Sequence, residues 1–261
     1  MSNITTLKVG NQTVTIEGGE LVGYQVSGHE FMHQKGNPGW RNVDTEMFPI
    51  IGPTNEAGFK VSTPKGVAIQ DQHGLLREMT YTITQSTESK AVFIKKYQAN
   101  KEVINSKYPA KSSTEKLSWP YDFEFNKTFE LKDDELVITF TIAGDQGMPF
   151  MLGYHPAFML HSKNPIISVG DKDISIDEVM AVGSRALLVP NTNIISLSDE
   201  KKLQISTEGF KHFMLWTEVP NMVCIEPITF YPYEVKQENL ADGFMHLTNK
   251  PSDFKVVLKP M

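Results

Sequence analysis

Short runs of alternating apolar and polar residues, separated by turn residues, recur near the start of the chain. Residues 12–16 alternate in this way, residues 7–9 and 20–26 form short segments on either side, and Gly10-Asn11 and Glu17-Gly18-Gly19 stand between them. A period of two places successive side chains on opposite faces of a strand, and glycine next to asparagine favours tight turns. This rhythm predicts a meander of short antiparallel strands in a sandwich or barrel.

The strongest hairpin signal lies in the middle of the chain. Residues 121–131 and 135–143 form two long runs, joined by the charged turn Lys132-Asp133-Asp134. Residues 79–85 and 91–97 form earlier runs, and Lys95 and Lys96 are expected at the exposed end of the second. These segments read as strands by the same criterion.

Helix signals are weak throughout the chain, and no long amphipathic pattern of period 3.6 appears. Residues 160–209 have a weaker pattern, in which only residues 179–188 could form a short helix. Strands are expected there and towards the C-terminus, at residues 166–169, 174–176, 186–189, 203–206, 213–216, 223–227 and 254–258. The sequence therefore predicts an all-β fold with few short helices, in a single domain spanning residues 1–261.

Two stretches of the chain are expected to be irregular, the first as a loop-rich segment and the second as a surface excursion. Residues 34–66 are rich in glycine and proline, and residues 99–119 are rich in lysine, serine and asparagine. Clusters of these residue types between periodic segments are typical of loops.

Composition narrows the class of protein. The 261 residues carry a formal net charge of -6, and the pI is near 5.7. This charge argues against a nucleic-acid partner, which usually requires a basic surface. No apolar run reaches the length of a membrane span, and the first residues lack the features of a signal peptide. Cys224 is the only cysteine, which excludes an intrachain disulfide and fits a reducing compartment. We therefore expect a soluble cytoplasmic protein.

A histidine stands within the apolar block Gly153-Tyr154-His155-Pro156-Ala157-Phe158. Pro156 ends regular strand pairing and holds His155 in an extended conformation. A histidine fixed at a strand end and facing a groove is well placed to give or take a proton near neutral pH. The alternative is a buried structural histidine with one backbone partner.

A carboxylate lies within another apolar run, at residues 223–227. Alternation places Cys224 and Glu226 on one face of this strand, opposite Val223 and Ile225. A buried carboxylate is costly unless it is partnered, which makes Glu226 a candidate acid or base. The alternative is a salt bridge to Arg77 or Arg41.

Two further pairs of residues are candidates for ligand binding. Trp40 and Arg41 could form part of a sugar-binding wall, or Trp40 could plug the end of the sandwich with Arg41 in solvent. His73 precedes Gly74, which permits a positive φ or a close backbone approach. Arg77 follows four residues after His73, and in a loop the two could converge.

Taken together, these blocks resemble the aldose 1-epimerase (galactose mutarotase) family. They follow the family's order from about residue 19 to about residue 230. The matching blocks are Gly19-Glu20-Leu21 with Gly28-His29-Glu30, Met47-Phe48-Pro49-Ile50-Ile51-Gly52, Gln72-His73-Gly74-Leu75-Leu76-Arg77, Gly153-Tyr154-His155-Pro156-Ala157-Phe158, and Trp216 with Cys224-Ile225-Glu226-Pro227. The resemblance implies a large antiparallel β-sandwich of the galactose mutarotase type, with a groove that binds a pyranose.

The resemblance also implies a role for each matching residue. Glu226 would take the proton from the C1 hydroxyl, His155 would protonate the ring oxygen, and His73 would hydrogen-bond the sugar near that oxygen. The opened aldehyde rotates about the C1–C2 bond and closes to the other anomer. With ordinary pKa values of about 4.3 and 6.5, a carboxylate and an imidazole would each help the other to stay charged. No metal or organic cofactor is required.

The remaining binding residues are less firmly placed. Many members of the family carry a sugar-contacting arginine directly after the glycine of the Phe-Pro loop, where this chain has Pro53. Arg41 or Arg77 could replace it, with Trp40 and Trp216 lining the groove. The expected partner is a small sugar, and the protein is expected to be a monomer or a homodimer.

Three alternatives to a hexose mutarotase remain open. A hexose 6-phosphate 1-epimerase would need cationic side chains around the 6-position, which Arg41, Arg77 and nearby lysines could supply. A carbohydrate-binding protein without catalysis would keep the groove, but it would not need His155 and Glu226 together. A metalloprotein could use His73, His155 and Glu226 as ligands. The other histidines have no motif around them and are expected to be surface or structural residues: His29, His33, His161, His212 and His246.

Overall fold

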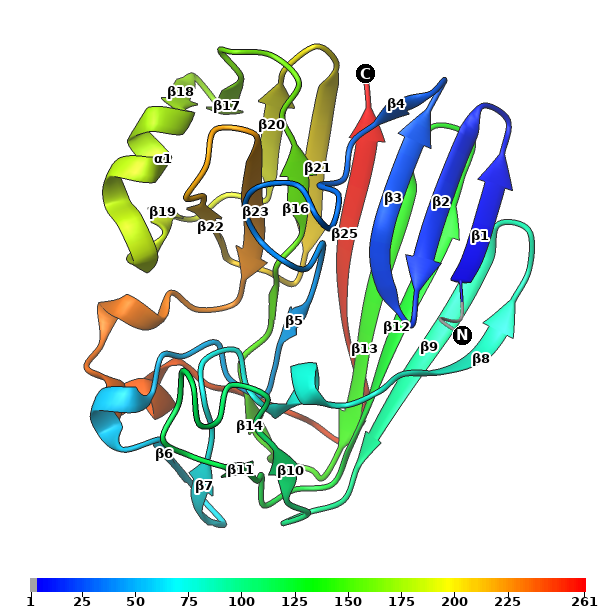
Figure 1. Cartoon of the computed structure of the whole chain (residues 1–261). Coiled ribbons are helices and arrows are strands. Elements are labelled where there is room, and N and C mark those ends of the chain that lie inside the picture. Colours follow the sequence, from blue (N-terminus) through cyan, green and yellow to red (C-terminus); the bar gives the residue numbers. More distant parts are fainter. Residues whose placement is uncertain (1–3) are drawn as a thin grey trace.

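The computed structural model describes residues 4–261, and antiparallel β-sheet dominates these residues (Figure 1). The predicted large all-β sandwich is confirmed. Its largest sheet contains nine strands, in the spatial order β18 (Lys172–Ser175), β17 (Ile166–Val169), β20 (Ile194–Ser198), β21 (Lys202–Glu208), β25 (Ser252–Pro260), β13 (Leu136–Gly144), β12 (Phe123–Leu131), β9 (Lys90–Tyr97) and β8 (Thr82–Ser86).

A second, smaller sheet carries the candidate chemistry. Its strands are β19 (Leu187–Val189), β22 (His212–Trp216), β23 (Met222–Ile228), β15 (Gly153–Tyr154) and β5 (Glu46–Met47), with β16 (Ala157–Met159) also paired to β23. All seven residues of β23 are buried, as expected for a central strand.

The predicted central hairpin is formed by β12 and β13, and it supplies one wall of the core. Burial alternates along the whole of β12, so every second side chain points away from solvent. Phe125 packs against Phe48 and Phe140, with ring centroids 5.3 Å and 5.9 Å away. Phe48 belongs to the loop that follows β5, so these rings join the large sheet to the smaller one.

The predicted N-terminal meander is also confirmed. Strands β1 (Ile4–Val9), β2 (Gln12–Glu17), β3 (Glu20–Val26) and β4 (His29–Glu30) form a four-stranded sheet. The side chain of Gln12 donates to the carbonyl oxygens of Lys132 and Asp133 at 2.6 Å and 2.9 Å. The meander is thereby attached to the turn between β12 and β13.

Short elements cover the ends of the sandwich. Three two-stranded ribbons are formed by β6 (Lys60–Thr63) with β7 (Gly66–Ile69), β10 (Val103–Ile104) with β11 (Lys116–Leu117), and β14 (Pro149–Phe150) with β24 (Met245–His246). The 3-10 helices are η1 (Asn55–Ala57), η2 (Leu75–Glu78), η3 (Gly183–Arg185), η4 (Pro232–Glu234) and η5 (Gln237–Gly243).

The expected helix over residues 179–188 is wrong in its limits. Helix α1 covers Ile176–Val182, because Ser175 and Glu178 form a reciprocal capping box at its start. Gly183, with φ 70°, ends it. Residues 187–189 form β19, which pairs with β22, in agreement with the strand expected at residues 186–189.

The expectation that Lys95 is exposed is also wrong. Its side chain is 5% exposed, whereas the neighbouring Lys96 lies in solvent. The Lys95 ammonium donates to the Leu76 carbonyl oxygen at 2.9 Å and lies 3.9 Å from the centre of the Tyr81 ring. Burial lowers the pKa of Lys95 to about 8.

None of the helices formed by residues 4–261 combines the length and the apolar character needed to cross a bilayer.

Candidate active site

A groove of about 500 Å³ opens at one end of the smaller sheet. The candidate residues reach it from loops and strands that lie far apart in the sequence. All seven side chains singled out in the sequence line it, namely Trp40, Arg41, His73, Arg77, His155, Trp216 and Glu226.

His155 lies between β15 and β16, where the chain bends past the smaller sheet. Its N–H donates to the Thr45 carbonyl oxygen at 2.9 Å, and the Thr45 N–H donates back to the His155 carbonyl oxygen at 3.3 Å. This reciprocal pair fixes the backbone of His155 to the segment that enters β5. Only 6% of the residue is exposed.

Glu226 lies on β23, with β22 on one side of that strand and β15 and β16 on the other. The predicted alternation is observed, since Cys224 and Glu226 lie close to His155 whereas Val223 and Ile225 belong to the main core. Glu226 is 2% exposed, so the central strand of the sheet holds a carboxyl in an apolar setting.

His155 and Glu226 are in direct contact, with 3.3 Å between His155 Nε2 and Glu226 Oε1. The alternative of a salt bridge from Glu226 to Arg77 or Arg41 is wrong, because no such ion pair occurs within residues 4–261. The structure thus pairs an imidazole with a carboxyl at the floor of the groove.

Burial sets the protonation of this pair. It raises the pKa of Glu226 well above its ordinary value. Burial, and after it the charge of Arg77, lowers the pKa of His155 to about 3. Both shifts favour the neutral forms, contrary to the expectation that each group would help the other to stay charged, because burial is the largest cause of the shift at each group.

His73 approaches the pair from a strained loop. Its φ is 76°, its N–H donates to the Ile51 carbonyl oxygen at 2.8 Å, and its carbonyl oxygen accepts from the Phe48 N–H at 3.2 Å. The His73 and His155 rings meet nearly edge-on, with centroids 5.4 Å apart. Burial, followed by the charge of His155, lowers the pKa of His73 well below its ordinary value.

Gly74 makes this loop possible. Its φ is 70°, and a Cβ at this position would overlap the backbone carbonyl of Phe48. The close approach inferred from the His73-Gly74 pair is therefore present.

Trp40 packs over His155 with ring centroids 4.3 Å apart and an interplanar angle of 28°. It lines the groove and does not plug the end of the sandwich. The buried His33 fixes its backbone, with Nε2 2.9 Å from the Trp40 carbonyl oxygen. Trp216 meets the other side of His155 at 6.0 Å. The two indoles thus enclose the imidazole.

The sequence did not single out several other residues that line the groove. Lys107 and Lys111 come from the polar segment between β10 and β11, and Tyr233 comes from η4. The many lysines of residues 99–119 were a signal, but their place over the groove depends on long-range packing.

The side chains that could bind a metal are not the three named in the metalloprotein alternative, which were His73, His155 and Glu226. Within the described chain, one group of donors within 4.8 Å of one another consists of His155, Cys224 and Glu226. His73 is not part of it. Burial raises the pKa of the Cys224 thiol well above its usual range, and the charge of Glu226 adds to this shift. A thiol that keeps its proton is a poor metal ligand.

Comparison with known proteins agrees with the fold. The galactose mutarotase-like protein from Lactobacillus casei ATCC 334 superposes with a TM-score of 0.78 at 15% identity, covering 99% of this chain and 100% of that one. The galactose mutarotase related enzyme from Lactobacillus acidophilus gives a TM-score of 0.78 at 19% identity, over 99% and 97% of the two chains. The aldose epimerase homologue from C. elegans gives 0.71 at 10% identity, over 100% and 99%. No curated protein matches the chain in sequence.

The fold and groove define a β-sandwich protein with a buried histidine–carboxyl pair in a groove of about 500 Å³. The family model for aldose 1-epimerase matches residues 13–209, which is well over half of the chain. The chain therefore belongs to the aldose 1-epimerase family. The matched span includes His73 and His155 and ends before Trp216 and Glu226, which the fold brings to the same groove.

Proposed function

We propose that this protein is an aldose 1-epimerase that interconverts the α and β anomers of a hexose by general acid–base ring opening and closure. Family membership supports an isomerase that acts on sugars. The observation that carries the finer proposal is the buried contact between His155 Nε2 and Glu226 Oε1 at 3.3 Å inside the groove.

Unsatisfied polar atoms point to where a ligand would bind. In the part of the chain that the structure describes, His73 Nδ1, His155 Nδ1 and Glu226 Oε1 are buried without a hydrogen-bond partner. Buried polar atoms in native proteins are nearly always satisfied. A pyranose carries both donors and acceptors and could complete these bonds, while Trp40 and Trp216 offer aromatic faces to its C–H groups.

Ring opening requires one proton removed and one delivered. Glu226 takes the proton of the C1 hydroxyl as the C1–ring oxygen bond breaks, and His155 gives a proton to the ring oxygen. The pair then consists of a neutral carboxylic acid and a neutral imidazole. Burial favours this arrangement at both groups, so ring opening removes two buried charges. Ring closure on the other face of the aldehyde reverses the two transfers.

The pair must hold one proton for this cycle to start. A proton on Glu226 and a proton on His155 are two arrangements of the same total charge, and the two side chains lie 3.3 Å apart. The raised pKa of Glu226 keeps this single proton in the groove to higher pH than an ordinary carboxyl would.

Exchange NMR on glucose and galactose tests the proposal. Wild-type protein is expected to accelerate anomer exchange, and Glu226→Gln and His155→Asn are each expected to reduce the rate about 10²- to 10⁴-fold. Glu208→Gln, at an exposed carboxylate paired with Lys255, provides the matched control and should exchange at the wild-type rate.

Two results would count against the proposal. Unchanged exchange in both active-site variants would remove the pair from the chemistry. Ligand-induced shifts without any exchange in the wild type would favour a carbohydrate-binding protein.

A further inference from the structure

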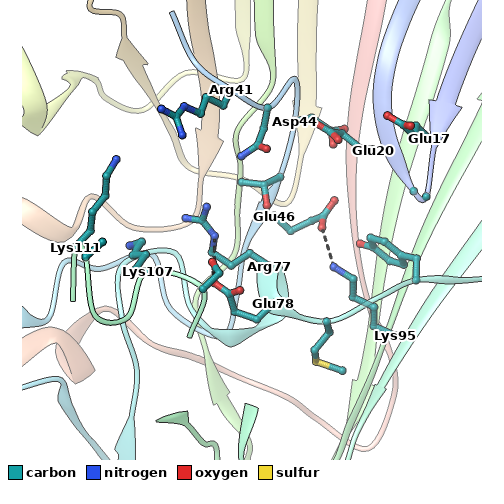
Figure 2. Close-up of a pocket in the computed structure, with 18 residues that line it drawn as sticks. Glu17, Glu20, Arg41, Asp44, Glu46, Arg77, Glu78, Lys95, Lys107 and Lys111 are labelled. Carbon is teal, nitrogen blue, oxygen red and sulfur yellow. Dashed lines mark hydrogen bonds and ion pairs between the residues drawn. The ribbon is translucent and has the colours of Figure 1, made fainter. Parts of the chain in front are cut away.

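Four cationic side chains gather at the mouth of the groove. Arg41, Arg77, Lys107 and Lys111 line both the groove and an adjoining cavity of about 580 Å³. Figure 2 shows their charged ends turned towards the same open space. This local excess of positive charge contrasts with the net charge of -6 of the chain.

The two lysines are held over the groove by a buried asparagine. Asn105 is 1% exposed, and its side-chain nitrogen donates to Asp71 Oδ2 and to the Thr114 carbonyl oxygen, both at 2.9 Å. Its side-chain oxygen accepts from the Lys107 N–H at 3.1 Å. The segment between β10 and β11 is thereby fixed beside the loop that carries His73.

Most of the nearby carboxylates are engaged with other cations. Asp44 and Glu46 contact Lys127 at 2.7 Å and 2.6 Å, and Glu20 is paired with Lys35. These acids have lysine partners of their own, whereas Glu218, which also lines the groove, forms no ion pair within residues 4–261 and offsets part of the positive charge there.

The four cations have few partners of their own. Arg77 lies 3.7 Å from Glu78, and the Lys107 ammonium lies 3.4 Å from Asp71 and donates to the Gln72 carbonyl oxygen at 3.1 Å. Arg41 and Lys111 have no ion pair within residues 4–261. Two full positive charges thus remain available to a ligand.

We propose that Arg41, Arg77, Lys107 and Lys111 form an anion subsite, and that the substrate is an aldose carrying a phosphate ester at the end of the sugar away from C1. This inference rests on the proposed function. Arginine and lysine are the usual phosphate ligands, through paired hydrogen bonds and point charge respectively. Two cations without an ion pair, Arg41 and Lys111, beside two that are paired, match a dianion better than the neutral hydroxymethyl group of a free hexose.

The position of the subsite relative to the pair fits a phosphate on C6. In a pyranose the ring oxygen joins C1 to C5, and C6 is attached to C5. His155 is assigned to the ring oxygen, and Trp40, which packs on His155, is directly followed by Arg41. A cation thus follows directly on the ring that packs against the acid, and with His155 serving the ring oxygen a phosphate on C6, one bond from C5, would lie near these cations.

A bound dianion would also assist the chemistry. Arg77 is among the causes that lower the pKa of His155 and of His73. A phosphate next to Arg77 would offset this charge and favour the protonated His155 that starts ring opening. The subsite would thus contribute to turnover as well as to binding.

The first test compares anomer exchange of glucose 6-phosphate with glucose, and of galactose 6-phosphate with galactose. Wild-type kcat/KM is expected to be at least about tenfold higher for the phosphates, since hydrogen bonds to charged groups are worth about that factor or more. The Lys107→Gln/Lys111→Gln variant is expected to lose most of this ratio. The Lys163→Gln control changes an exposed lysine elsewhere and should keep it.

Glucuronate separates a phosphate subsite from a general carboxylate subsite. It carries a single charge at C6, so its kcat/KM should fall nearer to that of glucose than to that of glucose 6-phosphate. A glucuronate rate equal to or above the phosphate rate would overturn the assignment to phosphate.

The rates on free and phosphorylated sugars test the proposed function and the anion subsite separately. Equal kcat/KM for phosphorylated and free sugars, both lost in Glu226→Gln, would overturn the subsite and leave the mutarotase intact. If no sugar exchanged, the proposed function would fail, and calorimetric titration with inorganic phosphate would still decide the subsite. Binding to wild type that weakens at least about tenfold in Lys107→Gln/Lys111→Gln would support it, and unchanged or absent binding would overturn it.

Discussion

At the scale of single residues, the defining feature is a carboxyl in a place where burial opposes its ionisation. Glu226 lies on a fully buried strand and contacts His155. Burial also favours the neutral form of this imidazole. Such a group weakens the fold whenever it must carry charge. Its place on a buried strand is better explained by chemistry than by stability.

The raised pKa of Glu226 makes the free energy of unfolding depend on pH. Because the folded-state pKa of Glu226 is raised, its neutral form stabilises the fold fully below the unfolded pKa of about 4.3, and this contribution is lost as the pH rises through the folded value. Glu226→Gln should therefore unfold with a free energy about 1 kcal/mol or more higher than wild type at pH 8, and equal to it near pH 4. Denaturant unfolding at both pH values measures this, and a less stable variant at pH 8 would contradict it.

At the scale of elements, the His73 loop depends on one glycine. Gly74→Ala would place a Cβ against the Phe48 carbonyl at a positive φ. It should cost about 1–3 kcal/mol of stability and raise KM for the sugar, because the loop must move His73.

Gly147→Ala provides the matched control for this prediction. Gly147 also has a positive φ, of 79°, but nothing lies within 4 Å of a Cβ there. It should cost about 1 kcal/mol through backbone strain alone and leave KM unchanged. Thermal unfolding and exchange kinetics of both variants separate the two contributions, and equal effects would show that the contact with Phe48 is unimportant.

Local pattern predicted the elements where local rules decide the structure. The period of two placed Cys224 and Glu226 on one face of β23, and turn residues marked the hairpins around β2 and β12. The pattern placed the helix too late. The capping box at Ser175 starts the helix before residue 179, and Gly183 ends it within the apolar run over residues 179–188.

Features that depend on distant partners could not be read from the sequence. Lys95 reads as a surface residue until Glu46, from a different sheet, lies near it, with 3.9 Å between Lys95 Nζ and Glu46 Oε2. Lys107 and Lys111 face the groove only because Asn105 ties their segment to Asp71. Alternation along a strand indicates which of its side chains are buried, but it does not indicate which segment of the chain packs over them.

At the scale of the whole molecule, a buried ion cluster joins the two sheets. Lys127 projects from β12 in the large sheet, is 0% exposed, and contacts Asp44 and Glu46 next to and within β5 of the smaller sheet. Tyr154, directly before His155, donates to the same Asp44 oxygen at 2.7 Å. The cluster therefore lies behind the strand pair that holds His155.

Removing one member of this cluster should be costly. Lys127→Met leaves Asp44 and Glu46 buried with less compensation, and it should destabilise the protein by about 3–5 kcal/mol. The triple variant Asp44→Asn/Glu46→Gln/Lys127→Met removes the charges together and should recover much of this loss. Denaturant unfolding measures the stability of both variants. If Lys127→Met were as stable as wild type, the contacts of the cluster between the two sheets would not contribute to stability.

The most direct measurement of the central claim is the pH dependence of kcat/KM for anomer exchange by the wild-type protein. A pair that needs one shared proton should work from above pH 3, where His155 starts to bind a second proton, up to the raised pKa of Glu226, where the last proton is lost. We expect a plateau that extends from above pH 3 through neutral pH, and a fall on its alkaline side. A rate that rises through pH 4–5 with the ionisation of an ordinary carboxylate, or no catalysed exchange at any pH, would contradict the account.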